Sequence, residues 1–372
     1  MHAISTAGWI CVDILNNSNN YFETRIMSSR GTILITGLNG YLAGRLAEAA
    51  LRAGYNVRGT VRNLAAGAEV QKALLGLGYG GGAEVVHVPN MIEPGAFDEA
   101  VIGCTAIVHL AATVNETWTL EPSEVVRMAV SSTTGILDSA LKAGAQLQSV
   151  VFMSSAAAIF DVPPEPGIYT EKDWNTTSGP AITKLGSDAG GLHAYCASKT
   201  VAERAFWRFR DERKPAFSMT SIQATYFIGP PLVPWKTKEQ IPYSLSNVWK
   251  LMQKEDVPGP MLLYESSIDI RDVARVILWS AINPNTADGE RFLCASAVGG
   301  AQAIADILNK HMPSLGVARG SPGQGYESGY PPTSGTIAFN AHKAVQATGQ
   351  DWIPYETSIT DTAKFLMQYL EK

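Results

Sequence analysis

Residues 31–44 read GTILITGLNGYLAG, and this run predicts both a fold and a ligand. Its first six residues are mostly β-branched or aliphatic, as in a buried strand, and residues 42–53 have the apolar spacing of a helix. Between them, two glycines allow a tight turn whose N–H groups, with the positive end of the helix, suit a dinucleotide pyrophosphate. The alternative is that the glycines serve only the backbone. The residues that we expect to contact a cofactor here are Gly37, Asn39, Gly40, Tyr41 and Leu42.

Strand-like and helix-like segments alternate along the rest of the chain. Further strands are predicted at residues 56–61, 84–88, 106–111, 148–154, 218–228 and 291–295, with a long helix at 124–143. This alternation predicts an α/β fold, a Rossmann-type doubly wound parallel sheet with a smaller, mixed C-terminal substrate lobe. The predicted boundaries are 1–28 for a flexible extension, 29–228 with about 265–296 for the Rossmann domain, and about 229–264 with 297–372 for the lobe. Long loops are expected at 161–191 and 316–334.

Composition narrows the classes of partner. The 372 residues carry a net charge of −5, which gives no electrostatic reason to bind nucleic acid or an anionic membrane. No apolar run reaches the roughly 20 residues of a membrane span. The four cysteines are scattered, which predicts reduced thiols in the cytoplasm and no metal site. They are Cys11, Cys104, Cys196 and Cys294.

The end of the second predicted strand bears on the choice of cofactor. An acidic residue there binds the ribose 2′-hydroxyl of NAD, whereas a basic one accommodates the 2′-phosphate of NADP. The sequence GTVRN at 59–63 contains no carboxylate, and Arg62 can form charge-assisted hydrogen bonds to a phosphate. We therefore expect NADPH (NADP⁺). The alternative is that Arg62 is only a solvated surface residue.

Three residues form a candidate catalytic group. Tyr195 and Lys199 are four apart in a predicted helix and so share a face. A nearby ammonium should lower the pKa of the phenol, which is otherwise about 10. Ser155 ends a predicted strand, where its hydroxyl could meet a carbonyl oxygen. Together the three would polarise a ketone or aldehyde while hydride arrives from a nicotinamide. An ordinary amphipathic helix is the alternative for Tyr195 and Lys199.

As a set, these motifs resemble the extended short-chain dehydrogenase/reductases, and within them the dihydroflavonol-reductase-like branch with its fungal and yeast aldehyde and ketone reductases. The resemblance covers about residues 30–372. The motifs that carry it are TGLNGYLA at 36–43, VRGTVR at 57–62, HLAA at 109–112, FMSSA at 152–156, YCASK at 195–199, IGPP at 228–231 and IDIRDVA at 268–274.

The resemblance implies that Ser155, Tyr195 and Lys199 are catalytic, with Lys199 also holding the nicotinamide ribose. It implies further cofactor contacts from Leu110, Ala111 and Ala112, from Asn90 and Met91 at the adenine edge, and from Ala224 and Tyr226 on the nicotinamide side. Two of these positions depart from the family pattern. Asn90 stands where an Asp is common, and Ala224 where a Pro is common.

Three functions compete. An NADPH-dependent reductase of an uncharged, fairly hydrophobic ketone or aldehyde is favoured, because the predicted lobe is rich in apolar and aromatic residues and poor in the basic residues that clamp a nucleotide sugar. Ser155 is followed by three alanines, which argues against dehydratase chemistry. A nucleotide-sugar epimerase with tightly held NAD is the alternative, and a non-catalytic dinucleotide-sensing regulator the third. A monomer or homodimer acting on a small-molecule carbonyl substrate is expected.

Overall fold

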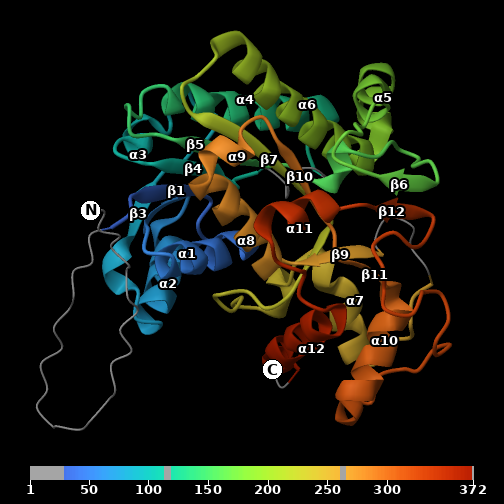
Figure 1. The fold of residues 1–372 in the computed structure, drawn as a ribbon. Coiled ribbons are helices and arrows are strands. Elements are labelled where there is room, and N and C mark those ends of the chain that lie inside the picture. The colour runs from blue at the N-terminus through green and yellow to red at the C-terminus, as the bar shows by residue number, and fades with distance from the viewer. Residues whose placement is uncertain (1–28, 113–118, 260–264, 371–372) are drawn as a thin grey trace, which may run out of the picture.

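A seven-stranded parallel sheet forms the centre of the computed structural model, which describes residues 29–112, 119–259 and 265–370 (Figure 1). Its strand order is β10-β7-β5-β4-β1-β2-β3, and every neighbouring pair is parallel. The strands are β1 (Thr32–Thr36), β2 (Asn56–Val61), β3 (Ala83–His87), β4 (Ala106–His109), β5 (Ser149–Met153), β7 (Ser218–Ala224) and β10 (Arg291–Cys294). The order reverses between β1 and β4, where a ligand crevice is expected in such sheets.

Helices cover both faces of this sheet, as the alternating sequence predicts. On one face lie α1 (Tyr41–Arg52), α2 (Leu64–Gly76) and α8 (Ile270–Ile282); on the other lie α3 (Asp98–Val101), α4 (Pro122–Ala140) and α6 (Gly190–Arg213). In β1, Ile33 and Ile35 join the core beneath α1 and α8, whereas Leu34 joins the core beneath α4 and α6. The two-residue alternation of a strand therefore supplies both cores, and the predicted Rossmann-type fold is confirmed.

A smaller mixed unit lies beside the carboxyl ends of the sheet strands. Its three-stranded sheet has the order β11-β9-β8, and its elements are β8 (Tyr226–Ile228), β9 (Ser266–Asp269), β11 (Ala297–Val298), α7 (Ser246–Met252), α10 (Gly300–His311) and α12 (Tyr355–Leu366). The three helices share one apolar core. The short α9 (Pro284–Ala287) and α11 (His342–Thr348) flank β10 and α8.

Two sequence predictions about local structure were wrong. The single strand expected at 218–228 is two strands, because β7 ends at Ala224 and β8 pairs instead with β9. The backbone turns away at Thr225, whose N–H donates to the Cys294 carbonyl at 3.1 Å. The expected loop at 161–191 contains β6 (Gly167–Tyr169) and α5 (Ser178–Leu185), and β6 pairs with β12 (Ile337–Phe339) in a separate two-stranded sheet. The segment 316–334 is without helix or strand, as expected.

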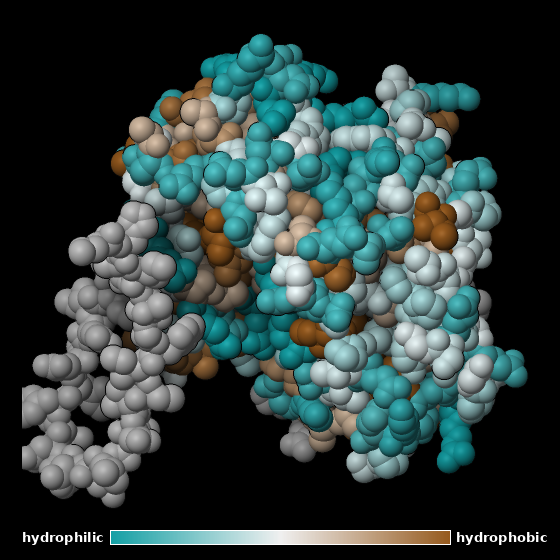
Figure 2. Space-filling view, viewed as in Figure 1, coloured by the Kyte–Doolittle hydropathy of each residue, from teal (hydrophilic) through white to brown (hydrophobic). Residues whose placement is uncertain are grey.

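The surface is mostly hydrophilic in the view of Figure 2, where hydrophobic residues form small separate groups. Within the described ranges, no helix combines the length and apolar character needed to cross a bilayer. Cys104, Cys196 and Cys294 are free and buried. The predicted extension at 1–28, with Cys11, lies outside the described residues.

Candidate active site

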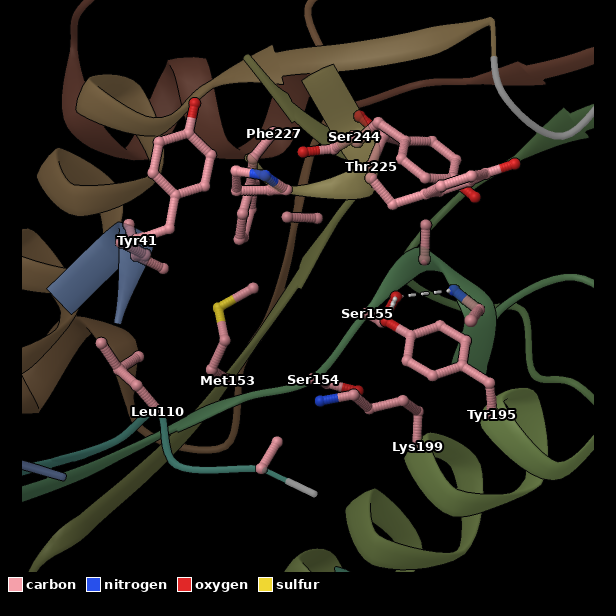
Figure 3. A pocket seen from close by; sticks show the side chains of 18 of the residues that line it. Tyr41, Leu110, Met153, Ser154, Ser155, Tyr195, Lys199, Thr225, Phe227 and Ser244 are labelled. Atoms are coloured by element: carbon pink, nitrogen blue, oxygen red, sulfur yellow. Dashed lines mark hydrogen bonds between the residues drawn. The ribbon is translucent and has the colours of Figure 1, made fainter. Parts of the chain in front are cut away.

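One cleft of about 850 Å³ runs along the carboxyl ends of the central strands, from the glycine turn to the start of α6. Figure 3 shows Tyr41 and Leu110 on one side of it and Ser155, Tyr195 and Lys199 on the other. It is lined by Gly37, Gly40, Tyr41, Leu42, Ala43, Leu110, Ala112, Met153, Ser154, Ser155, Ala156, Ala157, Phe160, Leu192, Tyr195, Cys196, Lys199, Ala224, Thr225, Tyr226, Phe227, Pro242, Tyr243, Ser244, Ser266 and Phe339. Most of the predicted site residues therefore meet in one space.

The glycine turn leaves room for a diphosphate. Gly37 has a φ of +70°, which side-chain-bearing residues rarely adopt, and a Cβ on Gly40 would come within 3.1 Å of the Gly37 carbonyl oxygen. Gly40 is also the N-cap of α1, so the positive end of that helix faces the turn. The Tyr41 hydroxyl donates to the Gly229 carbonyl and thereby ties the turn to the loop after β8. An open backbone cradle at a helix N-terminus fits a dinucleotide.

Thr36 fixes the loop that faces this turn. Its Oγ1 accepts hydrogen bonds from the N–H groups of Leu110 and Ala111, both at 3.0 Å, and so donates its own hydrogen to His109 Nδ1 at 2.9 Å. Burial, with the charge of Lys199, lowers the pKa of His109 to about 3. His109 is therefore neutral and buried in the core, where it accepts the hydrogen bond from Thr36 and does not titrate near neutral pH.

Tyr195 and Ser155 form the polar centre of the cleft. Tyr195, in α6, donates from its hydroxyl to Ser155 Oγ at 3.3 Å. Ser155 is the N-cap of a 3₁₀ turn, Ala156–Ala158, and its Oγ also accepts from the Ala157 N–H at 3.2 Å (Figure 3). Because Ser155 Oγ accepts twice, its own hydrogen remains available for a substrate oxygen.

The expected fall in the pKa of Tyr195 is not found. Burial raises the pKa of the phenol, and the hydrogen bond with Ser155 opposes this rise only in part. Lys199 responds to the same desolvation, because burial lowers the pKa of its ammonium to about 8 while the Glu203 carboxylate acts in the opposite direction. Tyr195 and Lys199 both lie in α6, as their spacing predicted, but burial is the main cause of the pKa shift of each.

A buried carboxylate behind the site escaped the sequence analysis. Glu203 is fully buried in α6, one turn beyond Lys199, and pairs with Arg291 of β10 at 2.8 Å. It also accepts hydrogen bonds from Ser154, Ser221 and Gln223. Its spacing in the sequence could have pointed to it, because Glu203 lies four residues after Lys199 and so on the helix face that carries Tyr195 and Lys199.

The end of the cleft next to Tyr195 has apolar walls. Its aromatic and aliphatic side chains include Phe160, Leu192, Tyr243 and Phe339. Of the described residues that line the cleft, Lys199 alone carries a formal charge. Of the apolar residues that follow β7, Phe227 and Tyr243 line the cleft, whereas Trp235, Trp249 and Met252 pack in the core shared by α7, α10 and α12. Met261, Leu262 and Tyr264 lie outside the described residues.

Five predicted cofactor residues lie beyond the lining of this cleft: Asn39, Arg62, Asn90, Met91 and Ala111. Arg62 is exposed directly after β2, and its carbonyl contacts His87 Nε2 of β3 at 3.2 Å. Asn90 is exposed after β3, where its amide donates to Glu93 at 2.8 Å and its carbonyl accepts from the Ile92 N–H at 3.3 Å. Arg62 and Asn90 thus sit at the neighbouring strand ends, on the β2–β3 side of the glycine turn.

Across residues 29–112, 119–259 and 265–370, no group of three or more His, Cys, Asp or Glu side chains is placed to bind a metal ion.

Comparison with known proteins gives a family match over most of the chain. Residues 33–295 match the model of the NAD dependent epimerase/dehydratase family. An uncharacterized oxidoreductase of Schizosaccharomyces pombe is 33% identical, over 76% of this chain and 82% of its own length. The NADPH-dependent methylglyoxal reductase GRE2 of Saccharomyces cerevisiae is 27% identical, over 91% of this chain and 98% of its own.

The solved structures agree with this match at the level of the fold. The crystal structure of yeast methylglyoxal/isovaleraldehyde reductase Gre2 complexed with NADPH superimposes with a TM-score of 0.79 and 24% identity, covering 91% of this chain and 99% of that one.

Proposed function

This chain belongs to the NAD-dependent epimerase/dehydratase family, and we propose that within it the protein is an NADPH-dependent carbonyl reductase. One observation carries the proposal. Ser155, Tyr195 and Lys199 meet in a cleft that is continuous with the glycine turn and has apolar walls. The relatives of this chain that are described above are both named as oxidoreductases or reductases, and one of them is named as NADPH-dependent.

The cofactor fits the residues at the strand ends. Gly37 and Gly40 would hold its pyrophosphate, Arg62 its 2′-phosphate and Lys199 its nicotinamide ribose. The remaining contacts would come from Asn39, Tyr41, Leu42, Asn90, Met91, Leu110, Ala111, Ala112, Ala224 and Tyr226. When bound, NADPH supplies the hydride.

The chain's own residues would handle the carbonyl oxygen and the proton. The Ser155 hydroxyl, which already accepts two hydrogen bonds, donates to the oxygen and polarises the carbonyl. Tyr195 then gives its proton to the developing alkoxide. Because burial raises the pKa of Tyr195, the phenol is protonated before the reaction, as a proton donor must be. Lys199 supplies the nearby positive charge.

The substrate is an uncharged, fairly hydrophobic ketone or aldehyde. Phe160, Leu192 and Phe339 offer apolar contact, and the lining residues that the structure describes include no arginine to clamp a diphosphate. We assign residues 29–228 with about 265–296 to cofactor binding and about 229–264 with 297–372 to the substrate lobe. Strands β8 and β9 lie within the first set of bounds but pair in the sheet of the smaller unit. The free thiols of the described cysteines favour a cytoplasmic location, and we expect a monomer or homodimer.

The test is a panel of aromatic and aliphatic ketones and aldehydes, with purified protein and loss of NADPH absorbance as the signal. Steady turnover with an uncharged carbonyl is expected. A protein that carries bound NAD through purification and interconverts a nucleotide sugar with no net cofactor change would be an epimerase. Tight NADPH binding without turnover of any carbonyl would indicate a dinucleotide-sensing regulator.

A further inference from the structure

Glu203 is an ionisable group that the proposed reaction leaves unused. Its side chain is fully buried in α6, one turn beyond Lys199. Both carboxylate oxygens are occupied. Oε1 accepts from Ser221 Oγ at 2.8 Å, Gln223 Nε2 at 2.6 Å, Arg291 Nε at 2.8 Å and Trp207 Nε1 at 3.3 Å, and Oε2 accepts from Ser154 Oγ at 2.5 Å and Arg291 at 3.4 Å.

Packing alone does not account for this arrangement. Removing a carboxylate and a guanidinium from water is costly, and apolar residues of similar volume often stabilise a protein as well or better than a buried ion pair. The donors to Glu203 suggest another use. Ser154 directly precedes Ser155, and Lys199 lies on the same face of α6. The carboxylate thus accepts a hydrogen bond from the side chain directly before one catalytic residue and lies on the same helix face as another.

Arg291 anchors the far side of the group. Its guanidinium lies 3.8 Å from the centre of the Trp174 ring. The same side chain donates to the carbonyl of Asp173 at 2.9 Å and to that of Glu171. Since Arg291 is held in place from the outside, Glu203 is held at a fixed position behind the active site.

We propose that Glu203 is a positioning residue, which holds the Lys199 ammonium by its charge and, through Ser154, fixes the strand end that carries Ser155. This inference rests on the proposed reductase function. The observations that carry it are the complete burial of the carboxylate, its place one turn from Lys199, and its hydrogen bond from Ser154.

The charge effect has a definite sign. The groups around Lys199 are His109 from β4, which is neutral, Tyr195 and Glu203 from the same helix, and Ser154, which directly follows β5. Arg291 of β10 faces Glu203. Burial lowers the pKa of Lys199 to about 8, and Glu203 opposes that fall. Loss of the carboxylate should therefore lower the pKa further, so that Lys199 loses its proton at a lower pH.

The experiment compares Glu203→Gln with the wild type over a range of pH. The basic limb of kcat/KM for NADPH-dependent reduction should move to lower pH by about one unit, the low end of the effect of a neighbouring charge. The dissociation constant of NADPH, measured by quenching of tryptophan fluorescence, should begin to rise at a correspondingly lower pH. Glu203→Asp keeps the charge and should restore most of both profiles.

Glu212→Gln is the matched control, because it makes the same chemical change on the exposed side of the same helix and should leave both profiles unchanged. If Glu203→Gln does not fold, the double variant Glu203→Gln/Arg291→Met removes both buried charges. Its kcat/KM and NADPH-binding profiles should show the same shift to lower pH. A folded Glu203 variant with lower kcat or melting temperature but unmoved profiles would overturn the proposal. If the wild-type protein reduces no carbonyl compound, the reductase function is refuted. The pH dependence of NADPH binding would then still test the role of Glu203.

Discussion

At the scale of single residues, Tyr195 is a buried, protonated phenol rather than the tyrosinate that its neighbour Lys199 first suggests. Its proton points at Ser155 Oγ in the structure, and both hydroxyls border the same cleft. A substrate carbonyl oxygen could accept hydrogen bonds from the hydroxyls of both Ser155 and Tyr195. The pair is thus arranged to deliver a proton, which matches reduction better than the removal of a proton from an alcohol.

Tyr195→Phe keeps the ring and removes this proton. Turnover of a carbonyl substrate should fall by about 100-fold or more, the usual contribution of a positioned acid. NADPH binding should survive, because the phenylalanine ring occupies the same space. Steady-state kinetics and fluorescence titration with NADPH measure the two effects. Near-wild-type turnover would remove Tyr195 from the proposed reaction.

Sequence reasoning reached the local part of this site and missed the distant part. Tyr195 and Lys199 are four residues apart, so their shared helix face could be predicted from the sequence. Glu203 has the same spacing, but its role depends on Ser221, Gln223 and Arg291, which come from two later strands, and Arg291 is 88 residues away. A lone glutamate in a helix is usually solvated, and only the tertiary structure shows that this one is enclosed.

At the scale of elements, α6 carries Tyr195, Lys199 and Glu203, and its packing against the sheet can be tested directly. Phe206 is 1% exposed and stacks on Phe152 of β5 with ring centroids 5.3 Å apart. Phe206→Ala should lower the free energy of unfolding by about 3–5 kcal/mol, the range for a deleted core aromatic. Urea denaturation measures this change. Arg208→Ala, on the exposed side of α6, should cost less than about 0.5 kcal/mol; a similar loss in both variants would contradict the role given to Phe206.

The end of β2 carries the prediction about cofactor choice. Arg62 follows Val61 with no carboxylate nearby in sequence, and its planar fork suits a 2′-phosphate. A charge-assisted hydrogen bond contributes roughly 1.5–3 kcal/mol, so NADPH should exceed NADH in kcat/KM by at least about tenfold. Arg62→Ala should remove most of that gap by weakening NADPH. Arg52→Ala, at the far end of α1, is the control, and an unchanged gap in the Arg62 variant would refute the assignment.

The elements differ in how far the sequence predicts them. The seven central strands lie between turn residues and contain β-branched or aliphatic side chains, and all seven were placed within a few residues. Strands β6 and β12 have three residues each, too few to show a period, and they exist because they pair with each other across the chain. Strand β8 follows β7 after a single residue, so the change of sheet at Thr225 leaves no gap in the apolar pattern.

At the scale of the whole molecule, the described cleft is built entirely from residues between Gly37 and Phe339. Deletion of residues 1–26 should therefore leave carbonyl reduction and the melting temperature unchanged. Thermal denaturation and the NADPH assay of the shortened chain, beside the full chain, measure both. A large drop in either would show that the segment contributes to the folded enzyme.

The pairing of β6 with β12 also implies an order of assembly on the ribosome. Domains generally fold as the chain emerges, and the last strand of the central sheet ends at Cys294, so the glycine turn and Tyr195 can take their places before Phe339 has been synthesised. Strand β6 must wait for a partner that is made more than a hundred residues later. A nascent chain stalled after Cys294 but before Phe339 should therefore already contain the folded glycine turn. The part of the cleft wall that contains Phe339 should form last.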